Sequence, residues 1–130
     1  MAEVSVVWRG DQVLAEISSA VLGAMTAAGQ ALAAGVVSSI SAPYPPASSP
    51  GQPPHRRSGG LRAEVTSRTT RAAGAVTMTV GVPSDSPVRT QAQALQGGTA
   101  RMAARPFVPT VERATAVVLD HVAAAVRAAR

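Results

Sequence analysis

The sequence contains no cysteine and no lysine, and few of its 130 residues are aromatic. Without cysteine, the chain can form no disulfide, no thiolate zinc site and no thiol nucleophile. Large aromatic side chains supply much of the buried apolar area in ordinary cores, but here they are limited to Trp8, Tyr44 and Phe107. Most of the apolar residues are Ala and Val, so we expect a thin core whose stability depends on partner subunits, as in obligate oligomers.

Positive charge exceeds negative charge, and arginine carries all of it. The formal net charge is +5, from 12 basic and 7 acidic residues, and all but one of the arginines lie at or after Arg56. A basic surface favours nucleic acid or acidic partners, so a small nucleic-acid-binding protein stays open as an alternative. Solvated surface charge with a few interface arginines is the more ordinary interpretation, and three aromatics do not provide the base-stacking platforms of many nucleic-acid readers.

The residues that carry catalysis are scarce. The histidines are His55 and His121; Asp120 precedes His121 directly, and adjacent positions on a helix do not face each other. The seven carboxylates are scattered without the spacing of metal ligands. A Gly-Gly-Thr turn at 97–99 lacks the lysine and framing of a phosphate-binding loop. We therefore expect no enzyme, no cofactor and no metal.

One uncharged segment, from Ile17 to Pro54, is long enough in its helix-like part to span a bilayer. Ala, Gly, Ser and Thr dominate it, and Gln30 lies inside it. Ala and Gly contribute little to membrane insertion. We expect a helix packed against protein and no membrane partner.

The first half of the chain predicts a strand at 4–8 and a long helix from Asp11, a candidate N-cap, to about Ser41. An apolar stripe recurs at the 3–4 spacing of one helix face, at Leu14, Ile17, Val21, Met25, Ala28, Leu32, Val36 and Ile40. Within this helix, Gly23, Gly29 and Gly35 allow close approach by a neighbour, which we expect to be another helix of this or an adjacent subunit. Residues 42–60 hold six prolines, a density that no helix or central strand tolerates. We expect an extended arm that either orders on a partner or stays a flexible loop.

The second half predicts a β-hairpin of residues 61–70 and 75–82 around Ala73-Gly74. Residues 88–96 are open between a helical turn and a strand, and 97–99 is a turn. Pro106 fits the first position of a terminal helix that extends to about Ala129. Its expected apolar face consists of Val111, Ala114, Val117 or Val118, His121 or Val122, Ala125 and Ala128. The sequence thus predicts a single α+β domain over residues 1–130, with the N-terminal and C-terminal helices packed on a small antiparallel sheet.

One further segment combines a turn, two arginines, the single phenylalanine and two prolines. It reads Gly98-Thr99-Ala100-Arg101-Met102-Ala103-Ala104-Arg105-Pro106-Phe107-Val108-Pro109. It resembles the signature of the head–tail joining, or tail-completion, family of long-tailed double-stranded DNA bacteriophages. Members carry Gly-Thr, a basic residue and Met, followed by Ala-Arg-Pro-Phe and a second proline. The matching residues here are Gly98, Thr99, Arg101, Met102, Ala104, Arg105, Pro106 and Phe107.

A weaker likeness lies after the proline-rich loop, where the family has Thr-Gly or Ser-Gly and then Leu-Arg. The corresponding residues are Ser58, Gly59, Leu61 and Arg62. The order of elements also fits, so the resemblance covers nearly the whole chain, although the 98–109 segment is the specific part. The family often has an aromatic and an acidic residue before the Gly-Thr, where this chain has Leu95, Gln96 and Gly97. The second proline, Pro109, comes one position early.

The resemblance implies a non-enzymatic virion protein that forms a homo-oligomeric ring, expected to be a hexamer, in the particle neck. It implies contacts with the tail tube or tail terminator, with the head connector or stopper, and transiently with DNA phosphates. The implied location is the neck of the virion, and the host cytoplasm during assembly. Another neck ring, such as a connector stopper or tail terminator, remains an alternative. We expect Phe107 to anchor the last helix, Pro106 to fix its start, and Arg101 and Arg105 to reach carboxylates of a neighbouring chain.

Overall fold

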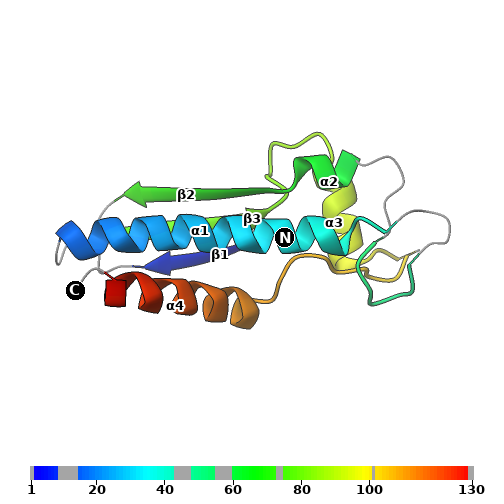
Figure 1. The fold of residues 1–130 in the computed structure, drawn as a ribbon. Coiled ribbons are helices and arrows are strands. Elements are labelled where there is room, and N and C mark those ends of the chain that lie inside the picture. Colours follow the sequence, from blue (N-terminus) through cyan, green and yellow to red (C-terminus); the bar gives the residue numbers. More distant parts are fainter. Residues whose placement is uncertain are drawn as a thin grey trace.

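The structure is a computed structural model that describes residues 2–8, 15–42, 48–54, 60–72, 75–100 and 102–128. A long helix and a shorter one lie along a three-stranded sheet, and two small helices gather at one end (Figure 1). The elements in chain order are β1 (Glu3–Trp8), α1 (Ala15–Ser39), α2 (Gly60–Glu64), β2 (Thr66–Ala72), β3 (Ala75–Gly81), α3 (Arg89–Gly97) and α4 (Val111–Ala128). The expected α+β class is confirmed.

The sheet has the order β1-β3-β2, and both neighbours run antiparallel to the central strand β3. The predicted hairpin is β2 paired with β3, and Ala72 lies opposite Ala75; the Ala73-Gly74 turn is outside the described residues. Alternation along β3 places Val76, Met78 and Val80 on one face, and all three are fully buried. That face carries the core because successive side chains of a strand point to opposite sides.

Helices α1 and α4 pack on the buried face of the sheet and against each other. The expected stripe of α1 is confirmed where its side chains are described: Val21, Met25, Ala28, Leu32, Val36 and Ile40 are all buried. The side chains of Leu14 and Ile17, and the candidate N-cap Asp11, lie outside the described residues. The largest fully buried side chains of the core are two methionines, one isoleucine and four valines, and Phe107 and Leu32 are each 5% exposed.

The close neighbour of Gly29 is the sheet, and at this glycine the expectation of a neighbouring helix is wrong. A Cβ added at Gly29 would lie 2.9 Å from Met78 Cγ and 3.3 Å from Ser67 Cβ. Gly23 and Gly35 face open space, with nothing within 4 Å of an added Cβ. Gly29 therefore allows the helix to lie close to β2 and β3, whereas Gly23 and Gly35 have no such close neighbour among the described residues.

By length and composition, the Ser19–Ser39 part of α1 could cross a membrane, and it is the one described helix of which this is true. Its apolar stripe is already covered by the sheet and α4. Its other face carries Ser19, Gln30 and Ser38, all exposed. The packing of this stripe agrees with the expectation of a helix that lies against protein.

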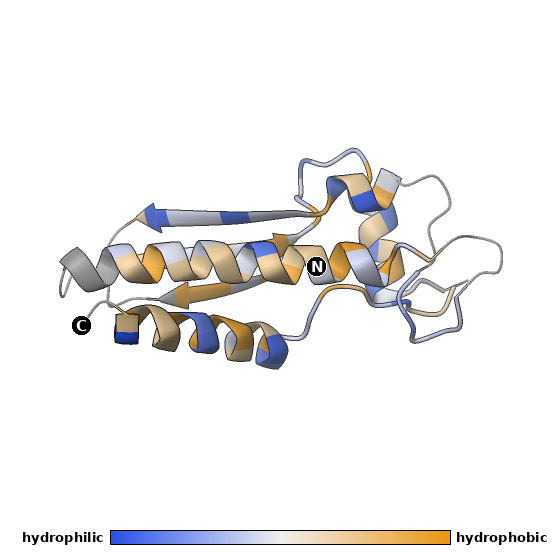
Figure 2. Ribbon diagram, in the orientation of Figure 1, coloured by the Kyte–Doolittle hydropathy of each residue, from blue (hydrophilic) through white to orange (hydrophobic). Residues whose placement is uncertain are grey.

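The opposite face of the sheet is polar. It includes Ser5 of β1 and Thr79 of β3, whose hydroxyl groups are hydrogen bonded at 2.9 Å, and the exposed Arg68 of β2. Strand β2 is largely hydrophilic along its length, whereas β1 is largely hydrophobic (Figure 2). The sheet thus buries one face and leaves a hydroxyl-rich face on the other side.

Two boundaries differ from the sequence expectations. Residues 61–65 were expected to begin the hairpin strand, but they follow Gly60 into helix α2, and β2 begins at Thr66. Leu61, Arg62, Ala63 and Glu64 are all good helix formers, and Leu61 packs half-buried against the core. Residues 88–96, left open between helix and strand, form most of α3.

The second boundary that differs from the sequence expectation is the start of the last helix. Helix α4 begins at Val111, so the expectation of Pro106 at its first position is wrong. Thr110 caps the helix, because its Oγ1 accepts a 3.2 Å hydrogen bond from the backbone N–H of Arg113. Pro109 disfavours helical backbone at Val108, the residue before it. Of the expected apolar face, Ala114 and Val118 are buried, but Val111 is 62% exposed and Ala128 is also exposed.

Candidate interface segment

The segment that carries the family resemblance, Gly98–Pro109, joins α3 to α4 and begins with a glycine that the backbone requires. Helix α3 ends where the Gly98 N–H donates to Ala94 O at 2.8 Å. Gly98 has a φ of 76°, and a Cβ there would lie 2.9 Å from Ala104 N and 3.1 Å from Met102 O. Side chains rarely adopt this left-handed conformation, so both the dihedral and the space favour glycine.

A tight turn follows the glycine. The Thr99 N–H donates to Met102 O at 2.8 Å, and the Met102 N–H donates back to Thr99 O at 3.3 Å. Arg101, between them, lies outside the described residues. Met102 is half-buried. The turn reverses the chain, so that residues 104–108 run back past α3.

Helix α3 holds the returning chain through one side chain and one carbonyl. Gln96 Oε1 accepts hydrogen bonds from the backbone N–H groups of Phe107 and Val108, both at 3.0 Å. The Arg105 N–H donates to Leu95 O at 2.6 Å. Nothing in the sequence pattern indicated Gln96, which was noted as a departure from the family. A glutamine that bonds to backbone 11 and 12 residues away leaves no periodic signal.

The same segment binds part of the proline-rich loop. Arg105 Nε donates to Ser48 O at 3.3 Å, and the Gly51 N–H donates to Ala104 O at 2.8 Å. Ser48 and Pro54 are buried. Within the expected 42–60 arm, residues 48–54 therefore pack against the Gly98–Pro109 segment, while 43–47 and 55–59 lie outside the described residues. Arg105 Nε is therefore hydrogen bonded within its own chain. The expected contact of Arg105 with a carboxylate of a neighbouring chain stays a prediction.

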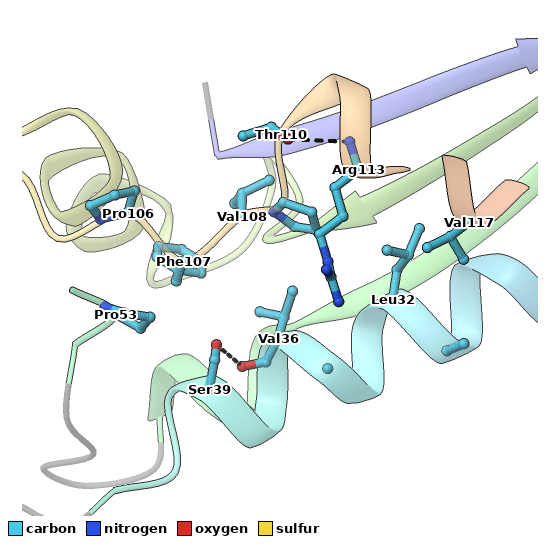
Figure 3. A pocket seen from close by; sticks show the side chains of 13 residues that line it. Leu32, Val36, Ser39, Pro53, Pro106, Phe107, Val108, Thr110, Arg113 and Val117 are labelled. Atoms are coloured by element: carbon cyan, nitrogen blue, oxygen red, sulfur yellow. Dashed lines mark hydrogen bonds between the residues drawn. The ribbon is translucent and has the colours of Figure 1, made fainter. Parts of the chain in front are cut away.

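An apolar groove of about 550 Å³ opens beside this segment. Its floor is α1, at Leu32, Gly35 and Val36, and one of its walls is Pro53. The opposite wall comes from residues 106–110 and from the first turns of α4 (Figure 3). Phe107 is 5% exposed and is part of the core cluster, so it lines the groove without standing out of it.

Arg113 alone carries a charge among the described residues that line this groove. Its side chain extends from α4 toward α1, past Val36 and Leu32 (Figure 3). Within the described part of the chain, no hydrogen bond or ion pair reaches its guanidinium group. The groove therefore offers an apolar surface with a cation at its rim that has no partner among the described residues, a combination that suits an apolar segment bearing a carboxylate.

The weaker family likeness maps onto α2, at the same end of the molecule as α3 (Figure 1). Ser58 and Gly59 lie outside the described residues. Leu61 packs against the core, and Arg62 Nη1 donates to Ser41 Oγ at 3.4 Å. Ser86 Oγ donates to Glu64 Oε2 at 2.8 Å. These contacts join α2 to the end of α1 and to the segment before α3.

The described residues show no catalytic constellation. They contain no group of three or more His, Cys, Asp or Glu side chains that could hold a metal ion. His121 Nδ1 lies 2.9 Å from Val117 O of its own helix. His55 lies outside the described residues. No protein-family model, curated protein or solved structure matches the chain.

Proposed function

We propose that this chain is a structural neck protein of a long-tailed double-stranded DNA bacteriophage, or of a phage-derived particle. It forms a ring, expected to have six subunits, that completes the tail and joins it to the head connector while DNA passes through. The observation that carries the proposal is the resemblance of Gly98–Pro109 to the signature of the head–tail joining family. The proposal places the protein in the virion neck, and in the host cytoplasm during assembly.

The described geometry supports an assembly role for this segment. Gly98 occupies a backbone position that disfavours side chains, and Phe107 is buried beside the groove. The segment also holds α3, α4 and residues 48–54 together. These contacts fix the relative positions of the elements that line the groove. We expect a partner to bind in the groove, next to Arg113.

The thin core is a second support. Small buried side chains limit the apolar area that the chain can remove from water on its own. Burial between subunits adds to that area, and a heterologous contact between unlike surfaces closes into a ring when its rotation permits. Another ring of the neck, a stopper or terminator, would meet the same demands and is the nearest alternative.

The nucleic-acid alternative rests on the formal net charge of +5. The described arginines fall on separate segments: Arg62 on α2, Arg68 and Arg71 on β2, Arg89 on α3, Arg105 before α4, and Arg113 and Arg127 on α4. In the proposed ring, contact with DNA is transient and sequence-independent, through phosphates. Tight, salt-dependent binding of DNA by the free protein would favour the alternative.

Native mass spectrometry tests the proposal, on the purified protein alone and mixed with tail tubes of the particle that encodes it. A closed ring, alone or formed on the tube end, is the expected result. The variant Arg113→Glu should abolish ring formation or tube binding, and Arg89→Glu, on α3 and away from the groove, should not. A persistent monomer that ignores tubes and binds DNA would overturn the proposal.

A further inference from the structure

Helix α4 leaves one stripe of its surface uncovered. Ala114 and Val118 are its buried residues, and they face the sheet and α1. On the other side, the exposed residues at 3–4 spacing are Glu112, Ala116, Leu119, Ala123 and Arg127. Leu119, near the middle of this helix, is 61% exposed.

The charges at the two ends of this stripe have no partner on their own helix. Ion pairs within a helix join residues three or four apart. Those positions are Thr115 and Ala116 for Glu112, and Ala123 and Ala124 for Arg127. No ion pair or hydrogen bond of either side chain is present among the described residues. Each charge suits the dipole of its helix end, but the order from acid to base also makes the stripe complementary to itself.

We propose that α4 binds α4 of a second copy of this chain, antiparallel, along the stripe. A two-fold axis between Leu119 and Asp120 places Glu112 of each copy opposite Arg127 of the other. The same axis places Ala116 opposite Ala123, and these small side chains let the two helices approach closely. The same axis places Leu119 of each copy opposite Asp120 of the other, and the two Leu119 side chains are neighbours across the centre because each lies directly beside the axis.

The expected dimer is weak. The 18 residues of α4 extend about 27 Å, and a contact along one such helix buries less than a standard interface. Exposed ion pairs contribute little to affinity, so the two Glu112–Arg127 pairs mainly select the antiparallel order. A two-fold contact is isologous and does not by itself close a six-membered ring. The dimer is therefore a state of the free protein, and it does not depend on the proposed neck function.

Charge-reversal variants of Glu112 and Arg127 test the antiparallel pairing, with dimer affinity measured by sedimentation equilibrium. The variants Glu112→Arg and Arg127→Glu each place like charges opposite each other in both pairs of a homodimer. We expect each variant alone to dimerise at least about tenfold more weakly than the unmodified protein, which corresponds to about 1.4 kcal/mol. Mixed one to one, they should form a heterodimer, because both of its pairs are again complementary. The double variant should regain the unmodified affinity.

Two matched controls carry the same charge changes away from the stripe. Asp85→Arg and Arg68→Glu alter exposed residues and should leave dimerisation unchanged. Circular dichroism of every variant checks that the fold is retained. A monomeric unmodified protein at about 1 mM, or single variants that dimerise as well as the unmodified protein, would overturn the inference. So would a one-to-one mixture that remains monomeric. Ring formation on tail tubes is measured separately, so failure of one proposal does not imply failure of the other.

Discussion

Gln96 and Phe107 are joined by a hydrogen bond in which the Gln96 side-chain oxygen accepts from the Phe107 backbone N–H at 3.0 Å. The same oxygen accepts from Val108, so one half-buried amide satisfies two successive backbone donors. Phe107 lies in the core, and its burial requires that its N–H be satisfied. The position of Phe107 beside the groove therefore depends on a residue of the preceding helix.

Replacing Gln96 by Leu should destabilise the fold, because it removes the acceptor and leaves two N–H groups without a partner. The expected loss in the free energy of unfolding is about 1–3 kcal/mol, measured by urea denaturation. Gln96→Glu retains an acceptor oxygen at the same distance along the side chain and should lose less. If the Leu variant proves as stable as the unmodified protein, this hydrogen-bond pair does not hold the segment.

Gly98→Ala should also destabilise the protein. A Cβ at this position lies 2.9 Å from Ala104 N, and the φ of 76° disfavours side chains, so we expect a loss of at least about 1 kcal/mol. The neighbouring Gly97 supplies the control, since nothing lies within 4 Å of its added Cβ. Gly97→Ala should be neutral or raise stability by up to about 1 kcal/mol. In thermal melts the midpoint should fall for Gly98→Ala and stay unchanged or rise for Gly97→Ala, and equal shifts would contradict the turn geometry.

Thr69→Val should stabilise the protein. Thr69 Oγ1 is buried, with no hydrogen-bond partner among the described residues, and the residue lies on the core face of β2 opposite Met78. Valine has nearly the same shape and removes the desolvated hydroxyl group, so the expected gain is about 1 kcal/mol. Thr70→Val, on the exposed face of the same strand, controls for β-propensity alone. Chemical denaturation that shows equal effects at both positions would argue against a buried, unsatisfied hydroxyl at Thr69.

Thr110→Ala should cost about 1 kcal/mol of stability by removing the cap of α4, whereas Thr110→Ser should retain the acceptor oxygen and most of the stability. Pro106→Ala tests the other candidate for the helix start. Because Pro106 precedes α4 by five residues, its replacement should leave helix content unchanged in circular dichroism. A loss of helix content in Pro106→Ala but not in Thr110→Ala would restore the original expectation.

The strongly periodic parts of the fold could be predicted from the sequence. The stripe from Val21 to Ile40 and the alternation of Val76, Met78 and Val80 identified their buried faces correctly, because each repeats the geometry of its element several times. Helix α2, with five residues, is too short to show a period. The start of α4 was placed at the first proline, but Thr110, after the second proline, supplies the cap.

The candidate segment was located by its resemblance, and its internal contacts were beyond sequence reasoning. The bond from Arg105 to Ser48 joins residues 57 apart, and the contact of Gly51 with Ala104 is similarly distant. Contacts of this kind depend on how separate elements come together, which local propensity does not encode. The groove has the same origin, since α1, Pro53 and the start of α4 each supply part of it.

The position of β3 at the centre of the sheet has a consequence for synthesis. Strand β1 leaves the ribosome early, but its partner β3 follows much later: the hydrogen-bonded hydroxyls of Ser5 and Thr79 are 74 residues apart. At about 5–20 residues per second, several seconds separate the two strands. During that interval the apolar edge of β1 has no strand to pair with. Strand β1 is therefore exposed in the nascent chain for seconds before the strand that covers its edge has been synthesised.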